Sequence, residues 1–134
     1  MSDVLTADQI WDLRDRVHAL MPGLRADLEA LTRIPSVSLD AFDQAHVEAS
    51  AQATAQLLRA EGLEVEIVRE GGRPAVIGHL AGPPGSRTVM LYAHHDVQPE
   101  NDHAEWDSPP WEPTARPDQH GEVRLFARGA ADDK

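Results

Sequence analysis

An unbroken apolar run at residues 88–93, Thr-Val-Met-Leu-Tyr-Ala, constrains the fold of this 134-residue chain more than any other feature. A strand that lacks alternating polar residues is usually central in its sheet and covered on both faces. We therefore expect a buried strand at residues 88–93. The expected fold class is α/β, with two N-terminal helices followed by the strands of a mixed central sheet.

Two segments before this run have the pattern of helices. Apolar residues in the first recur at steps of three and four, which is typical of an amphipathic helix that faces a core: Ile10, Leu13, Val17, Leu20, Leu24, Leu28 and Leu31. Pro22-Gly23 falls inside this pattern and predicts a kink or a restart. The second helix is expected at 43–61, with Asp43 as N-cap and Gly62 as the left-handed residue after its end.

Shorter segments are typical of strands and turns. Residues 63–69 alternate between apolar and acidic side chains, which predicts a half-buried strand, and residues 74–80 predict its neighbour. A proline-rich structured loop is expected at 101–119, and a last short strand at 123–127. We see no repeat, linker or domain boundary in this pattern.

Composition limits the classes of partner and metal site. The chain has 23 acidic and 12 basic residues, and its net charge of −11 disfavours binding to nucleic acid and to anionic membranes. The first residues contain no signal-peptide core and no apolar span long enough to cross a membrane, so we expect a cytoplasmic location. Because there is no cysteine, any metal must be bound through His, Asp or Glu.

The strongest chemical signal follows the apolar run directly. In extended backbone, residues two apart point to the same side, so His94 and Asp96 are expected to come within reach of each other. A carboxylate that accepts a proton from one imidazole nitrogen leaves the other nitrogen to bind a metal. The alternative is an ordinary surface histidine followed by an aspartate that opens a turn.

A second signal stands at the end of the sequence, in Arg-Gly-Ala-Ala-Asp-Asp-Lys at 128–134. Adjacent carboxylates beside a flexible stretch can bind a cation, and one carboxylate can bridge two ions. The alternative is a solvated acidic turn.

Together these segments resemble metallopeptidase family 20, which includes acetylornithine deacetylases, succinyl-diaminopimelate desuccinylases, carboxypeptidase G and carnosinase-type dipeptidases. The resemblance covers nearly the whole chain and rests on five motifs in order: LTRIPSVS at 31–38, GLEVEIV at 62–68, AHHDVQP at 93–99, WDSPPWEPT at 106–114 and RGAADDK at 128–134. The second-to-last motif and the Val-Gln-Pro after Asp96 are more similar to the dipeptidase branch.

The resemblance implies a fold, an activity and a site. Residues 1–134 are expected to be the N-terminal part of a catalytic domain that uses two zinc ions, with cobalt or manganese as substitutes, to cleave dipeptides or N-acyl amino acids. His94 is implied as a zinc ligand and Asp132 as the bridging ligand. Asp96 is implied as the catalytic residue that orients His94. His95 falls on a variable position of the motif and is not assigned as a ligand.

The resemblance also implies residues that this chain lacks. In relatives, the general-base glutamate and the remaining ligands follow later in the sequence. The full-length enzyme is expected to form a homodimer. We therefore expect the 134-residue chain alone to be inactive. Two other interpretations remain open: a non-catalytic remnant that folds onto a partner chain, and a weak single-metal binding module.

Overall fold

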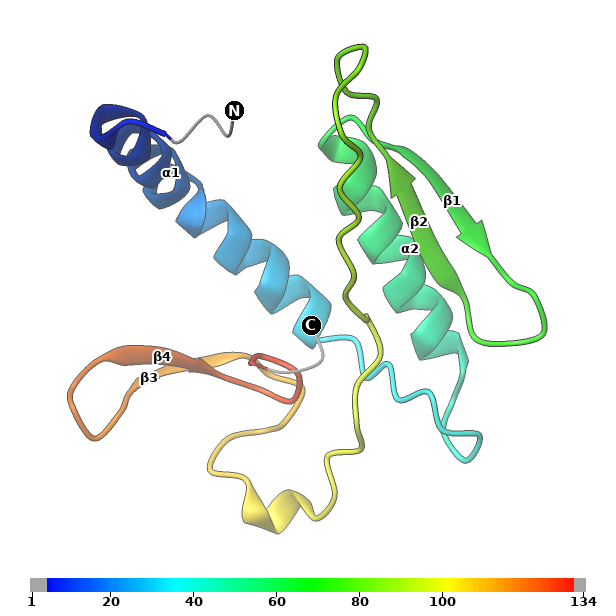
Figure 1. Cartoon of the computed structure of the whole chain (residues 1–134). Coiled ribbons are helices and arrows are strands. Elements are labelled where there is room, and N and C mark those ends of the chain that lie inside the picture. Colours follow the sequence, from blue (N-terminus) through cyan, green and yellow to red (C-terminus); the bar gives the residue numbers. More distant parts are fainter. Residues whose placement is uncertain (1–4, 132–134) are drawn as a thin grey trace.

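The computed structural model describes residues 5–131, so Asp132 and Asp133 lie outside the described residues. Two helices come first, α1 (Ala7–Thr32) and α2 (Ala45–Ala60). They are followed by β1 (Glu64–Val68), β2 (Ala75–His79), the short 3-10 helix η1 (His103–Glu105), β3 (Thr114–Pro117) and β4 (Val123–Phe126). The α/β class with two leading helices is confirmed (Figure 1).

The helix α1 begins and continues for clear local reasons. Thr6 and Gln9 form a reciprocal capping box at its start. Pro22 lies inside α1, which is one continuous element, so the helix does not restart there, and the predicted kink stays a prediction. His18, whose carbonyl loses its N–H partner at Pro22, is exposed, so water can bond that carbonyl.

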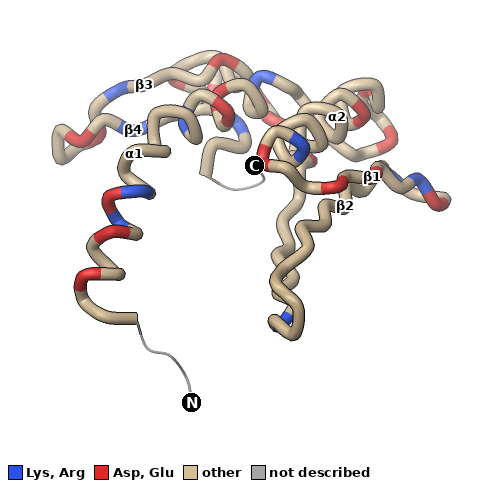
Figure 2. The backbone as a smooth tube through the Cα atoms, turned by 90° about the horizontal axis from the view of Figure 1, so that it is seen from above, with Lys and Arg blue, Asp and Glu red and all other residues tan. Residues whose placement is uncertain are grey.

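The expectation that α1 faces a core is also wrong within the described residues. Its apolar stripe is about half exposed, as Ile10, Leu13, Val17, Leu20 and Leu24 show at 47%, 48%, 52%, 62% and 53%. Acidic and basic residues are interleaved elsewhere on the helix, where Arg16 pairs with Asp12 at 2.9 Å (Figure 2). The helix is amphipathic as predicted, but no described segment covers its apolar stripe.

The second helix packs on a hairpin. Val47, Ser50, Ala51 and Ala55 are its buried residues, while β1 and β2 pair antiparallel with Val65 opposite Gly78. The predicted strands 63–69 and 74–80 are confirmed to within a residue or two. Gln44, rather than Asp43, is the N-cap, although Asp43 Oδ1 still accepts the Ala45 N–H at 2.9 Å.

The end of α2 is as expected. Gly62 has φ +84°, the left-handed conformation that glycine adopts without steric cost. The chain then enters β1 through Leu63, whose N–H donates to the Leu58 carbonyl at 3.2 Å.

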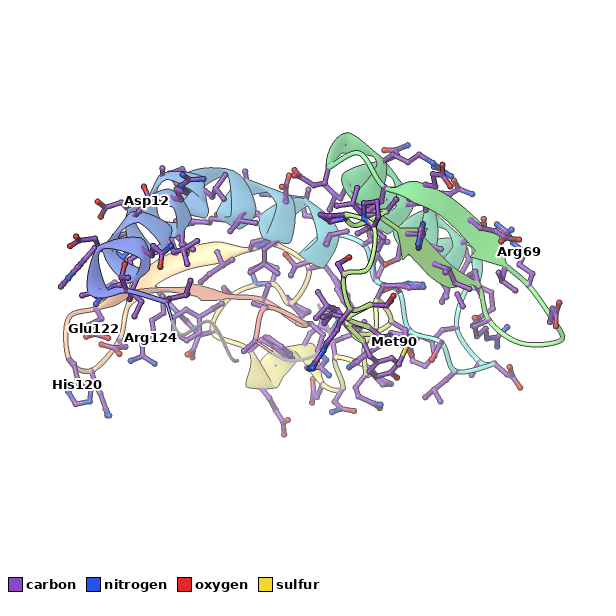
Figure 3. The ribbon with its side chains drawn as sticks, turned by 45° about the horizontal axis from the view of Figure 1, so that its top comes forward. Asp12, Arg69, Met90, His120, Glu122 and Arg124 are labelled. Carbon is purple, nitrogen blue, oxygen red and sulfur yellow. The ribbon has the colours of Figure 1, made fainter. Side chains whose placement is uncertain are left out.

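The central strand expected at 88–93 is not formed. These residues run as a coil from the end of β2 (Figure 1), and Met90 projects from it in Figure 3. Val89, Met90, Leu91 and Tyr92 are 77%, 88%, 91% and 89% exposed. A strand requires a neighbour for its N–H and C=O groups, and no strand among residues 5–131 pairs with this segment.

The sheet differs from the mixed one we expected. Two separate antiparallel hairpins form, β1–β2 and β3–β4, and the one isolated parallel bridge in the described part of the chain joins Val37 to Val97. The predicted loop 101–119 contains η1 and also β3, which pairs with the predicted strand β4. Pro117 is acceptable in β3 because it stands at the end of a two-stranded hairpin.

Few residues of the described chain are fully buried. They include Thr32, Ser36, Val37, Val47, Ser50, Ala51, Ala55, Val97 and Pro110. These residues come from the end of α1, the loop after it, α2, the segment after the coil and the proline-rich loop. Val97, which follows Asp96 directly, forms the bridge with Val37, so the His-x-Asp segment lies beside buried residues.

Candidate metal centre

The segment 94–97 is held against the loop that follows α1. The Val97 N–H donates to the Ser36 carbonyl at 3.1 Å, and the Ser36 and Ser50 hydroxyls both donate to the His95 carbonyl, at 2.9 Å and 2.8 Å. The loop and the N-terminal half of α2 thus fix the backbone on either side of Asp96.

His94 and Asp96 are in contact. The Nδ1 atom of His94 lies 3.2 Å from Asp96 Oδ1 and 3.1 Å from the Asp96 carbonyl oxygen. Both oxygens are acceptors, so Nδ1 carries a proton, and in the neutral ring Nε2 then carries the lone pair. The expected proximity of the two side chains is therefore confirmed, and the tautomer is the one in which Nε2 can bind a metal.

The carboxylate of Asp96 is held at both oxygens. Its second oxygen, Oδ2, accepts the Ser38 hydroxyl at 2.6 Å. Burial by itself raises the pKa of Asp96, but the hydrogen bonds from Ser38, His94 and its own backbone N–H outweigh burial and hold that pKa below its ordinary value. Asp96 is therefore an anion at neutral pH.

The neighbouring histidine, His95, makes a different contact. His95 Nε2 lies 3.0 Å from the Pro74 carbonyl, which is an acceptor, so this nitrogen donates and ties the segment to the start of β2. His94 and His95 thus adopt opposite tautomers. This geometry agrees with leaving His95 out of the predicted ligands.

The chain that leads into Asp132 comes close to the same segment. Arg128 Nε donates to the Gln98 carbonyl at 2.8 Å, and the Arg128 N–H donates to the Pro110 carbonyl at 2.7 Å. Arg128 therefore lies beside the residues that follow the His-x-Asp motif. The role predicted for Asp132 falls on a residue outside the described range and stays a prediction.

The described residues fit one part of a metal site. His94 supplies one nitrogen donor with its orienting carboxylate, which is a common arrangement for a zinc-bound histidine. Within residues 5–131 no group of three or more His, Asp or Glu side chains is placed to hold an ion. A catalytic zinc normally has three protein ligands, so the described residues by themselves do not complete such a site.

Sequence reasoning missed the serines of this site. Ser36 and Ser38 stand two apart in Pro-Ser-Val-Ser and both contact segment 94–97. Their spacing, the same as that of His94 and Asp96, was the available signal. Arg73 was also missed, and its Nε donates to the Ser38 carbonyl at 3.1 Å.

Comparison with known proteins identifies the family to which the chain belongs. No protein-family model matches the chain. The Cys-Gly metallodipeptidase DUG1 of Candida albicans is 30% identical over 135 residues, which cover 91% of this chain and 27% of that protein. The chain belongs to metallopeptidase family 20.

Two further matches agree with this family 20 assignment. The Cys-Gly metallodipeptidase dug1 of Schizosaccharomyces pombe is 41% identical over 61 residues, which cover 46% of this chain and 12% of that protein. The solved structure of the dipeptidase Dug1p of Saccharomyces cerevisiae matches with a TM-score of 0.74 at 24% identity, over 89% of this chain and 27% of that one. This structural likeness supports the fold.

The family 20 chain spans about a quarter of the length of the relatives that match most of it, 27% in each of two cases. No helix among its described residues is both long enough and apolar enough to cross a membrane.

Proposed function

We propose that this chain contributes metal ligands, and the carboxylate that orients one of them, to the catalytic domain of a metallodipeptidase. The observation that carries the proposal is the contact between His94 Nδ1 and Asp96 Oδ1 at 3.2 Å, in a chain whose relatives are named Cys-Gly metallodipeptidases. The proposed substrates are dipeptides or N-acyl amino acids, and the proposed metal is zinc, two ions per site, with cobalt or manganese as substitutes.

Each residue of this chain has a limited role in the proposal. The Nε2 atom of His94 would hold one ion, and Asp96 would keep the imidazole in the required tautomer. Asp132 would bridge the two ions. The bound metal would polarise the scissile carbonyl and lower the pKa of water. No described carboxylate of this chain is assigned as general base, so the proposed reaction requires a base beyond these residues.

The proposed partner is a small peptide, with no nucleic acid or membrane bound. The net charge of −11 supports this, since it repels phosphate groups. We further propose a cytoplasmic location and a homodimeric full-length enzyme.

A first experiment tests whether His94 binds a metal ion. We expect the 134-residue chain to bind zinc weakly in a calorimetric titration and to hydrolyse no dipeptide, because two candidate ligands are too few for a catalytic site. His94→Ala should abolish the binding. The matched control is His103→Ala, which removes another exposed imidazole in contact with a carboxylate, Glu100, at 3.1 Å. Equal loss of zinc binding in both variants, or none in either, would contradict the assignment.

A second experiment tests the activity. This chain would replace the matching segment of the Candida albicans relative, and thermal melting would establish that the chimera folds. We expect the chimera to hydrolyse Cys-Gly and to lose that activity on His94→Ala but not on His103→Ala. A folded, zinc-loaded chimera without turnover would rule out a catalytic role and favour a binding module.

A further inference from the structure

Asp96 makes two directed contacts, one from each oxygen. Its Oδ1 faces His94 Nδ1 at 3.2 Å, and its Oδ2 accepts the Ser38 hydroxyl at 2.6 Å. A carboxylate held at one oxygen can still rotate about its side-chain torsions. Held at both, its plane is fixed relative to the imidazole.

Three contacts restrain the backbone around Ser38. Val37 forms the parallel bridge with Val97, Arg73 Nε donates to the Ser38 carbonyl at 3.1 Å, and Gln44 Nε2 donates to the Leu39 carbonyl at 2.7 Å. Val37 is 1% exposed, so this part of the loop is anchored in the core. The hydroxyl is therefore presented to Asp96 with little conformational entropy left to lose.

The Asp96 carboxylate helps to set the tautomer of His94, together with the Asp96 carbonyl. Which imidazole nitrogen is protonated depends on the hydrogen bond that the ring makes. The Asp96 carboxylate contributes one of the two acceptors that place the proton on Nδ1. If the carboxylate turns away, the protonated Nε2 tautomer becomes accessible, and that nitrogen can no longer donate its lone pair.

We propose that Ser38 is a positioning residue for the metal-binding histidine. Its hydroxyl fixes the Asp96 carboxylate, and the carboxylate holds His94 in the tautomer whose Nε2 faces a divalent metal. The naming of the metal rests on the proposed function, whereas the link from Ser38 to the tautomer does not. Ser38 was not among the site residues expected from sequence.

A purely structural role makes a different prediction. In that case Ser38 only joins the loop after α1 to segment 94–97, as Ser36 does through the His95 carbonyl at 2.9 Å. Removal of either hydroxyl would then lower stability, and neither would change the state of the His94 ring. Ser36→Ala is thus the matched control for Ser38→Ala.

The test reads the His94 ring directly in the metal-free chain. Long-range 1H–15N spectra of the labelled protein report the protonated nitrogen, and His94→Gln assigns the signal. We expect Nδ1–H in the wild-type chain and a shift toward Nε2–H in Ser38→Ala, while Ser36→Ala keeps the wild-type spectrum. Should Ser38→Ala not fold, Ser38→Thr and Ser38→Val give the same comparison, since only threonine keeps the hydroxyl.

The metal gives a second, separate measurement. In a zinc titration, Ser38→Ala should raise Kd about three- to tenfold, less than the 10- to 100-fold typical when the carboxylate itself is lost, and Ser38→Thr should restore it. The proposal is overturned if wild-type His94 carries its proton on Nε2, or if Ser38→Ala and Ser38→Val leave the ring unchanged. If the wild-type chain binds no zinc, the proposed function fails, and the tautomer result still decides the role of Ser38.

Discussion

At the scale of single residues, serine hydroxyls hold the His94–Asp96 pair, the proposed metal-binding unit, in place. Ser36 and Ser50 bond the His95 carbonyl, and Ser38 bonds the Asp96 carboxylate. A serine hydroxyl is neutral. It can donate a hydrogen bond to a buried or half-buried acceptor without adding a charge that would compete with the proposed metal ion.

The substitution Asp96→Asn tests the charge of the carboxylate that faces His94. The amide keeps the shape of the carboxylate but loses its charge, so it holds the His94 N–H more weakly and can turn its NH2 group toward the ring. We expect zinc affinity to fall 10- to 100-fold in a titration. Glu100→Gln is the control, because it alters the corresponding carboxylate beside His103 at 3.1 Å. Comparable losses in both variants would point to a general effect of charge.

At the scale of elements, the unit of α2 with the β1–β2 hairpin is the best-supported part of the described fold. A two-stranded hairpin is marginal by itself and needs an apolar surface to pack on. The buried Val47, Ala51 and Ala55 of α2 provide it. The hairpin in turn contacts the site, because the Pro74 carbonyl at its turn accepts a hydrogen bond from the His95 side-chain Nε2 at 3.0 Å.

The packing of α2 on the hairpin depends on Gly78. A Cβ built there would lie 2.8 Å from Leu63 Cδ2 and 3.3 Å from Leu58 Cδ1. We expect Gly78→Val to reduce the free energy of unfolding by about 1–3 kcal/mol, the usual cost of overpacking. Gly72→Val is the control, since nothing lies within 4 Å of a Cβ at Gly72. Urea denaturation of the two variants measures the difference, and equal stability would show that the leucines move aside.

An ion pair between α2 and the end of β1 predicts an acid dependence. Arg69 donates to both carboxylate oxygens of Glu48, and these bonds lower the pKa of Glu48 from its ordinary 4.5. A lowered folded-state pKa adds stability above the unfolded value, and that stability is lost as the pH falls through the folded value.

Glu48→Gln should therefore flatten the decline of Tm when the pH is lowered from neutral to about 3. The expected effect is small because both side chains are substantially exposed, at 40% for Glu48 and 47% for Arg69. Arg69→Gln should give the same profile, and the double variant should add nothing further. A steeper decline in Glu48→Gln would contradict the pairing.

At the scale of the whole molecule, much apolar surface of the described residues is uncovered. The stripe of α1 and the coil at 88–93 both expose large side chains, with Leu91 at 91% and Leu20 at 62%. Contiguous exposed apolar surface favours association. Few side chains of the described residues are fully buried in return.

We expect the 134-residue chain to self-associate at micromolar concentration in sedimentation velocity runs. Leu91→Lys should shift the distribution toward monomer, because a charge in the exposed coil opposes its burial. Leu80→Lys is the control, since Leu80 is also exposed, at 65%, but lies outside residues 88–93. If both variants behave like the wild-type chain, the coil is not the associating surface.

The sequence by itself determined the local features. Gly62 specifies the end of α2, and the alternation of apolar and acidic residues at 64–68 specifies the first strand. Both patterns depend on neighbouring residues alone. The two-residue spacing of His94 and Asp96 likewise predicted their contact. The five ordered motifs indicated the family, which the Candida albicans relative supports.

Only the tertiary structure decided the rest, because those features depend on residues distant in sequence. The coil at 88–93 has the composition of a central strand, but a strand exists only where another segment bonds its backbone. The apolar stripe of α1 predicts a helix and leaves open what covers it. Likewise, the Asp96 carboxylate that faces His94 Nδ1 accepts the hydroxyl of Ser38, which stands 58 positions earlier in the chain, and no local pattern predicts that contact.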